Sequence, residues 1–162
     1  MATVDYFLKI DGIDGESTDN KHKNEIDVLS WSWGETQSGT MAGGGGGGAG
    51  KVAMQDFHFV MKVNKASPKL LQACACGEHI KKAVLICRKA GKDQQEYLKI
   101  TLSDLIVSSY QTGGSSGSDI LPTDQISLNY SKIEVEYKEQ KADGTLGGAV
   151  KGGWNLKENK PA

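Results

Sequence analysis

The sequence of 162 residues is poor in three things: excess charge, long apolar runs and aromatic side chains. It has 19 Lys and Arg against 20 Asp and Glu, so the formal net charge is −1. A protein that binds nucleic acid would show a basic surplus or a basic stripe, and this balance argues against that class. The longest apolar run, residues 83–87, is too short to cross a bilayer. Aromatic residues make up 7% of the chain, so we expect a mainly aliphatic core.

Cysteine is scarce and odd in number, with only Cys74, Cys76 and Cys87. Disulfide frameworks of secreted proteins favour even counts, so three thiols indicate synthesis in a reducing compartment. The N-terminus has no basic segment followed by an apolar one. We therefore expect a cytoplasmic protein without a cleaved signal peptide.

Glycine is in excess, with 21 residues, of which nine lie within 34–50 and five within 144–153. Glycine-rich loops within one folded domain explain this distribution better than a disordered chain does. We expect a single domain over residues 1–162, with an extended loop at 34–51 and a second loop at 142–153.

Elsewhere the dominant hydrophobic period is two, which is typical of strands. The expected strands are 4–10, 26–34, 52–63, 83–89, 95–102, 105–111, 126–137 and 154–156. In the expected strand 126–137 the alternation of apolar residues changes phase near Ser131 and Lys132, which predicts a bulge. One short helix is expected at 67–77, with Ser67 capping its first amides and Gly77 ending it. The sequence thus predicts a mainly β fold, a compact antiparallel barrel of two sheets with one helix on its side.

The glycine run invites comparison with a phosphate-binding loop, because residues 45–52 nearly match G-x-x-x-x-G-K-[ST]. Val52 replaces the hydroxyl residue that would hold magnesium. The segment after it has the period of a strand, whereas a phosphate-binding loop opens a helix. A nucleotide-binding enzyme built on Gly45 to Lys51 is therefore the weaker alternative, and a surface loop is favoured.

Other candidate sites are equally weak. Cys74, Cys76 and His79, with Cys87 added, could form part of a metal site, but C-x-C on a helix directs the two thiols apart. The three histidines are scattered, and no nucleophile signature accompanies them. A solvated strand face explains the alternating lysines and glutamates at 132–138. We expect no cofactor, no metal and no catalytic residues.

The most informative segment is Trp31-Ser32-Trp33. The two rings should lie in the core together with Leu29, so that Ser30 and Ser32 lie on the opposite face. That face would be polar, narrow and uncharged. It can be an ordinary solvated surface, or it can line a channel that attracts neither sign of charge.

Several motifs in the same order resemble the Hcp family of bacterial type VI secretion proteins. They are DYFLKIDGIDGES at 5–17, EIDVLSWSWG at 25–34, SG at 38–39, the glycine run with its AGKV, RKAG at 88–91, VSS at 107–109, GG at 147–148 and GWN at 153–155. The resemblance covers nearly the whole chain.

The resemblance implies a hexameric ring that stacks into a hollow tube and carries effector proteins in its lumen. It implies partners in the VgrG spike, the contractile sheath and the baseplate, no nucleic acid and no membrane insertion. It also implies a bacterial cytoplasmic pool that is exported through the type VI apparatus. Within this interpretation Ser30 and Ser32 are expected to face the lumen and effectors. The residues expected to contact the next ring are Thr40, Met41, Gly43, Gly44, Gly45, Gly46, Gly47, Gly48 and Lys51.

Overall fold

The computed structural model describes residues 4–39, 51–90, 94–117 and 121–162. It is mainly β with one helix, as predicted. The elements in chain order are β1 (Val4–Ile10), β2 (Ile26–Asp27), β3 (Ser30–Ser32), β4 (Glu35–Thr36), β5 (Ala53–Met54), β6 (Phe57–Lys62), α1 (Ala66–Cys76), β7 (Ile80–Lys89), β8 (Glu96–Gly113), β9 (Thr123–Gln140), β10 (Leu146–Asn155) and β11 (Lys160–Pro161). Within the described residues, no helix is both long and apolar enough to span a membrane.

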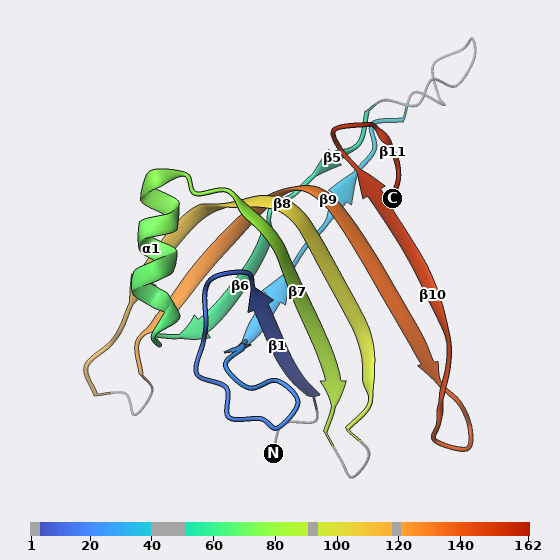
Figure 1. The fold of residues 1–162 in the computed structure, drawn as a ribbon, viewed down its shortest axis with the longest axis horizontal. Helices are drawn as coiled ribbons and strands as arrows, with labels where there is room; N and C mark the ends of the chain where they lie inside the picture. Colours follow the sequence, from blue (N-terminus) through green and yellow to red (C-terminus); the bar gives the residue numbers. More distant parts are fainter. Residues whose placement is uncertain (1–3, 40–50, 91–93, 118–120) are drawn as a thin grey trace.

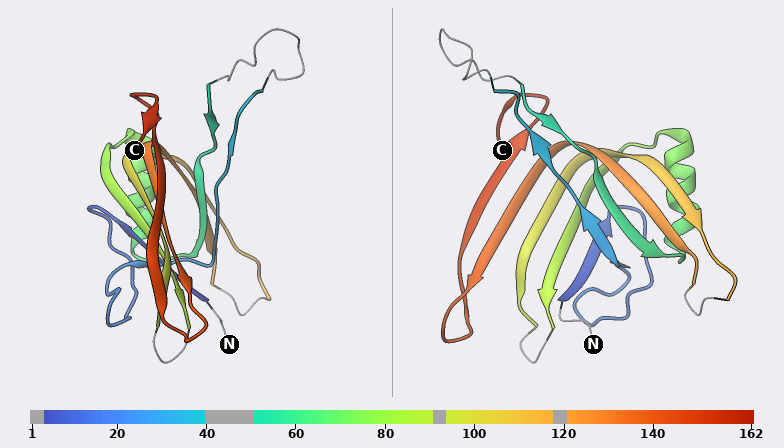
Figure 2. Two further views of the ribbon diagram at one scale, coloured as in Figure 1. Left: turned by 90° about the vertical axis from the view of Figure 1, so that its right-hand side faces the viewer. Right: turned by 180° about the vertical axis from the view of Figure 1, so that it is seen from behind.

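The strands form two layers (Figures 1 and 2). The first layer follows the order β11-β10-β9-β8-β7-β1-β2. The second layer has the order β3-β6-β9-β8, because β6 pairs with residues 123–128 of β9, which pair in turn with residues 107–113 of β8. All pairs are antiparallel. Residues 26–32 connect the layers, because Val28 N donates to Tyr6 O of β1 and Leu29 N donates to Val60 O of β6. β4 and β5 form a separate two-stranded arm that extends from the body.

Helix α1 closes one end of the space between the layers and packs against β8. Gly77 ends it in the left-handed conformation, at φ 64°, as predicted. The start of the helix differs from the prediction. Asn64 Oδ1 accepts from the Ala66 amide, whereas Ser67 lies inside the helix and its Oγ donates to Asp124 Oδ2 at 2.5 Å. The buried Ser67 Oγ also accepts from the Asn64 amide at 3.0 Å, so this hydroxyl both closes the start of the helix and joins it to β9.

The core between the layers is aliphatic with a small aromatic group. Phe57 and Phe59 are completely buried, and Trp31 stacks on Phe57 at 6.0 Å between ring centroids. The predicted core position of Leu29 is wrong, since its side chain is 48% exposed while Val28 beside it is buried. The chain bends between β2 and β3, so the alternation does not continue unbroken from residue 26 to residue 34.

The predicted loop at 142–153 is also wrong, because most of it is strand β10, paired with β9. Glycines in a strand mark places where another backbone comes close. A Cβ on Gly153 would lie 2.6 Å from Ile133 O, so only glycine fits this position. At Gly153, therefore, the glycine that suggested a loop is a requirement of close strand packing.

The phase change predicted near Ser131 occurs, but its form is different. On β9 the alternation of buried side chains shifts by one residue between Tyr130 and Ile133, and on β8 it shifts by one residue between Leu102 and Leu105. These residues face each other in register, so both strands change phase together. Asp104 adopts φ 51° at this point. The register shift of this pair lies further along β8, between Val107 and Ser109.

Candidate functional site

The outer face of the second layer is an uncharged polar surface built from four neighbouring strands. Register places Ser32 beside His58 and His58 beside Ser127, and Ser127 in turn lies beside Ser109. Two residues further along each strand, Ser30 pairs with Val60, Val60 pairs with Gln125, and Gln125 pairs with Gln111. Between these two rows, Tyr110 pairs with Ile126. We call this surface the polar face; its members are Ser30, Ser32, His58, Val60, Ser109, Gln111, Gln125, Ser127 and Asn129.

Charges stand only at the two ends of the polar face, among the strand positions described. At one end, Asp56 accepts hydrogen bonds from Ser108 Oγ at 2.7 Å and from Asn129 Nδ2 at 2.8 Å. At the other end, Lys62 pairs with Thr123 at the start of β9. Between them lie hydroxyl, amide and imidazole groups and the apolar side chain of Val60, and His58 Nδ1 is 3.3 Å from Ser127 Oγ. The surface can therefore hydrogen-bond to what lies against it without attracting either sign of charge strongly.

The two serines singled out from the sequence lie on this face and are exposed. Trp31 and Trp33 point to the opposite side and are partly buried against the core, as the alternation predicted. The sequence did not indicate the other members, because β8 and β9 are far from β3 along the chain. Only pairing through β6 brings Ser127 and Ser32 to the same surface.

The four-stranded sheet beneath the polar face has a free edge on each side. β3 pairs only with β6 among the described strands. Within the same set of strands, residues 106–113 of β8 pair only with β9, because pairing of β8 with β7 reaches no further than Leu105. Unpaired strand edges are sites at which another chain can add.

The base of the arm is fixed to β9 through a hydrogen-bonded chain. Trp33 Nε1 donates to the Tyr130 hydroxyl, which donates in turn to Gln55 O at 2.9 Å. Burial raises the pKa of Tyr130 to about 12, so its hydroxyl keeps the proton that it donates. Gln55 N also donates to Gly34 O. These contacts hold the two strands that lead to the glycine-rich loop.

The residues expected to contact the next ring lie mostly outside the described residues. These are Thr40, Met41 and the glycines 43–48. Lys51, at the described end of that segment, is exposed. The strand β5 follows it, not the helix that a phosphate-binding loop requires.

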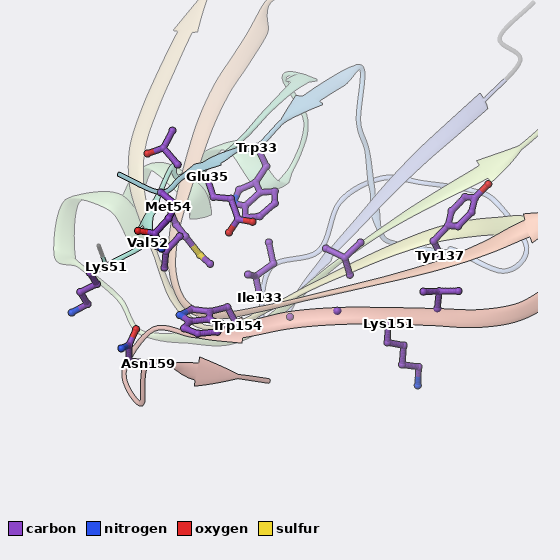
Figure 3. Close-up of a pocket in the computed structure, with 16 residues that line it drawn as sticks. Trp33, Glu35, Lys51, Val52, Met54, Ile133, Tyr137, Lys151, Trp154 and Asn159 are labelled. Atoms are coloured by element: carbon purple, nitrogen blue, oxygen red, sulfur yellow. The ribbon is translucent and has the colours of Figure 1, made fainter. Parts of the chain in front are cut away.

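A groove of about 1060 Å³ lies between the arm and the sheet of β9 and β10 (Figure 3). Its walls are mainly apolar, with Trp33 and Met54 on the arm side and Ile133, Val150 and Trp154 on the sheet side. Sequence reasoning did not predict this groove, because residues 142–153 were expected to be a loop and not strand β10.

The cysteines do not gather into a site in the described part of the chain. Cys76 is exposed and Cys74 partly buried on α1, while Cys87 is buried on β7. Burial raises the pKa of Cys87 to about 12, so its thiol is protonated and unreactive. Within the same residues, no three His, Cys, Asp or Glu side chains are placed to hold a metal ion.

Comparison with known proteins gives a consistent result. The family model described as "Type VI secretion system effector, Hcp" matches residues 7–137. Protein hcp1 of Pseudomonas aeruginosa is 52% identical over 161 residues, which cover 98% of this chain and 99% of that protein.

Solved structures agree with this match. The crystal structure of Hcp1 from Salmonella typhimurium is 43% identical, with a TM-score of 0.85 over 99% of this chain and all of that one. A structure titled as a type six secretion system protein is 34% identical, with a TM-score of 0.91 over 98% of this chain and 99% of that one.

Proposed function

Because this chain belongs to the Hcp family of type VI secretion system proteins, we propose that six copies close into a ring and that the rings stack into a tube. In this proposal the tube is exported through the secretion apparatus and carries effector proteins in its lumen. The chain acts as a structural component and carrier, not as an enzyme. Its further partners are the VgrG spike at the tip, the contractile sheath outside and the baseplate.

The observation that carries the proposal is the polar face together with the two free edges of its sheet. A ring of identical copies needs two different surfaces on each copy, one for each neighbour. The edge of β3 and the edge of β8 at 106–113 lie on opposite sides of one four-stranded sheet. Edge-to-edge pairing of successive copies would continue that sheet around the ring and cover both unpaired edges.

Such a ring would place the polar faces of all copies on one continuous surface, and we assign them to the lumen. An uncharged lining of small polar groups allows cargo to be held by hydrogen bonds without strong electrostatic trapping. Ser30 and Ser32 would lie next to the junction between copies, because β3 is the edge strand. The exposed Ser30 and Ser32 hydroxyls are therefore available for contact with effectors.

The contact between rings is assigned to the arm. Its base is fixed by Trp33, Tyr130 and Gln55, and its strands lead away from the body toward residues 40–50. In this proposal Lys51 and the glycine-rich loop contact the adjacent ring. Six consecutive glycines have no side chains, so the backbone of this segment can approach a second surface closely.

Light scattering and negative-stain electron microscopy of the purified protein test the ring. We expect a particle of six times the 17.3 kDa chain mass, with a central opening. A monomer at every concentration, or a compact particle without an opening, would overturn the proposal. Isothermal titration with ATP and magnesium is the control for the nucleotide alternative, for which we expect no heat of binding.

A further inference from the structure

His58 is the one member of the polar face whose side chain changes charge near neutral pH. The other members carry hydroxyl, amide or aliphatic groups, whereas imidazole ordinarily gains or loses its proton between pH 5 and 8. His58 is half-buried on the interior strand β6, and register places Ser32 on one side of it and Ser127 on the other. A change of charge at this residue therefore occurs in the middle of an otherwise neutral row.

Fixed charges stand around this imidazole only at a distance, among the described residues. On β6, Asp56 and Lys62 share its face two and four residues away, about 7 and 13 Å along the strand. Both Asp56 oxygens already accept hydrogen bonds from neighbouring side chains. β3 carries no charged residue, and the carboxylates that flank it, Asp27 and Glu35, lie outside the strand. On β9, Asp124 is buried on the opposite face, and the part of β8 in this layer has no charged residue.

Protonation also changes the hydrogen bonds that His58 can make. In the imidazolium form Nδ1 carries a proton and donates to Ser127 Oγ, 3.3 Å away, so the Ser127 hydroxyl proton is free to donate to a ligand. Nε2 is then a second charged donor, and no described residue hydrogen-bonds to it. The exposed Ser32 hydroxyl, on the neighbouring strand, is a further donor. The protonated row thus offers N–H and O–H donors beside one positive charge, a set from which a carboxylate accepts strongly.

We propose that His58 is a charge switch of the polar face: in its protonated form it binds carboxylate groups of cargo proteins, and in its neutral form it releases them. This inference rests on the proposed ring and names the class of cargo, proteins with an acidic surface segment, that the lumen holds at mildly acidic pH. Each copy brings one His58 to the shared lumen, so protonation adds one positive charge per copy to a lining that is otherwise neutral. The same charge repels basic segments, so the switch selects cargo by sign.

Fluorescence anisotropy with labelled peptides tests the switch on the assembled chain. The probes are a rhodamine-labelled peptide of alternating Glu and Ser and a peptide of the same length with Lys in place of Glu, each at pH 5.5 and pH 8.0 and at one ionic strength. For the acidic peptide we expect about tenfold tighter binding at pH 5.5, the effect of one hydrogen bond to a charged group. The basic peptide should bind no more tightly at pH 5.5 than at pH 8.0.

Three substitutions locate the effect. His58→Gln keeps a polar side chain that cannot gain a charge, so it should bind the acidic peptide weakly at both pH values. His58→Lys is charged at both, so it should bind the acidic peptide at pH 8.0 as tightly as at pH 5.5. His79→Gln is the matched control, because His79 is exposed in the turn after α1 and is not part of the polar face. This control should keep the tenfold difference, and light scattering at both pH values checks the ring in every variant.

The outcomes separate the switch from the ring. If rings form and His58→Gln keeps the tenfold difference, the pH dependence has another source and the inference is overturned. Rings of the unmodified chain that bind the acidic peptide equally at both pH values, or at neither, also overturn it. If the unmodified chain forms no ring at either pH, the proposed function itself fails.

Discussion

Arg88 and Asp19 form a bidentate ion pair that fixes residues 11–25 onto the sheet. Arg88 Nη1 donates to Asp19 Oδ1 at 3.0 Å, and Nη2 donates to Oδ2 at 2.7 Å. Nη2 also lies 3.1 Å from Asp5 Oδ2. The Arg88 side chain is only 3% exposed, and its guanidinium lies 4.7 Å from the centre of the Phe7 ring. The segment between β1 and β2 is thus held by a largely buried charge pair.

Asp19→Asn should destabilise the protein substantially. The amide cannot accept two hydrogen bonds from the guanidinium, and a buried cation loses most of its compensation. Loss of one partner of a buried pair costs on the order of 3 kcal/mol, and Asp5 moderates the loss here. Urea unfolding at pH 7 measures it. Asp14→Asn, at an exposed position of the same segment, is the control and should stay within about 0.5 kcal/mol of the unmodified chain.

The same pair predicts how stability depends on pH. The hydrogen bond from Arg88 lowers the pKa of Asp19 from 3.8 to about 2 in the folded protein. The pair therefore contributes fully above pH 3.8, and its contribution is lost as the pH falls toward 2. The difference in unfolding free energy between the unmodified chain and Asp19→Asn should shrink over that interval. A difference that stays constant from pH 5 to pH 2 would contradict this assignment.

Tyr130→Phe should loosen the base of the arm. The substitution removes the acceptor of the Trp33 indole and the donor to Gln55 O, and it leaves both groups without a partner. We expect a loss of about 1 kcal/mol, the usual net contribution of a hydrogen bond, because Gln55 is exposed and Trp33 is only partly buried. Hydrogen exchange should quicken at β4 and β5 more than at β7. Uniform quickening in both places would mean that Tyr130 acts only through overall stability.

Ser32→Asp tests the assignment of the polar face to the lumen. Ser32 is exposed and lies in register with His58, so the carboxylate would introduce charge into an uncharged surface. We expect retention of effector in a pull-down to fall at least tenfold, while light scattering still reports rings. Ser32→Ala is the matched control and should retain more effector than Ser32→Asp. Equal retention by all three chains would remove Ser32 from the cargo surface.

Shortening the glycine run tests the contact between rings. Deletion of three of the glycines 43–48 leaves the anchored base of the arm and the sheet edges untouched. We expect rings of normal mass but fewer stacked rings in electron micrographs at equal protein concentration. If stacking is unchanged, or if ring closure fails first, the glycine-rich loop is not the contact between rings.

Local rules predicted much of the fold because they depend on neighbours along the chain. Gly77 ends α1 because glycine adopts the left-handed conformation without steric cost. The alternation correctly placed Trp31 and Trp33 on the core side and Ser30 and Ser32 on the polar side, although it failed for Leu29. The same rules failed for β10, because the need for Gly153 comes from Ile133 on a different strand. They also failed for Ser67, whose partner Asp124 is distant in sequence.

The sequence by itself determined that this chain is a β-rich domain with balanced charge, and its motifs pointed to the Hcp family. These properties follow from composition and from the two-residue period of strands. Only the tertiary structure decided which distant strands share a surface, and with it the polar face, the free edges and the groove. Strand pairing joins residues that are far apart in sequence, and one unpredicted strand changes which surfaces stay uncovered.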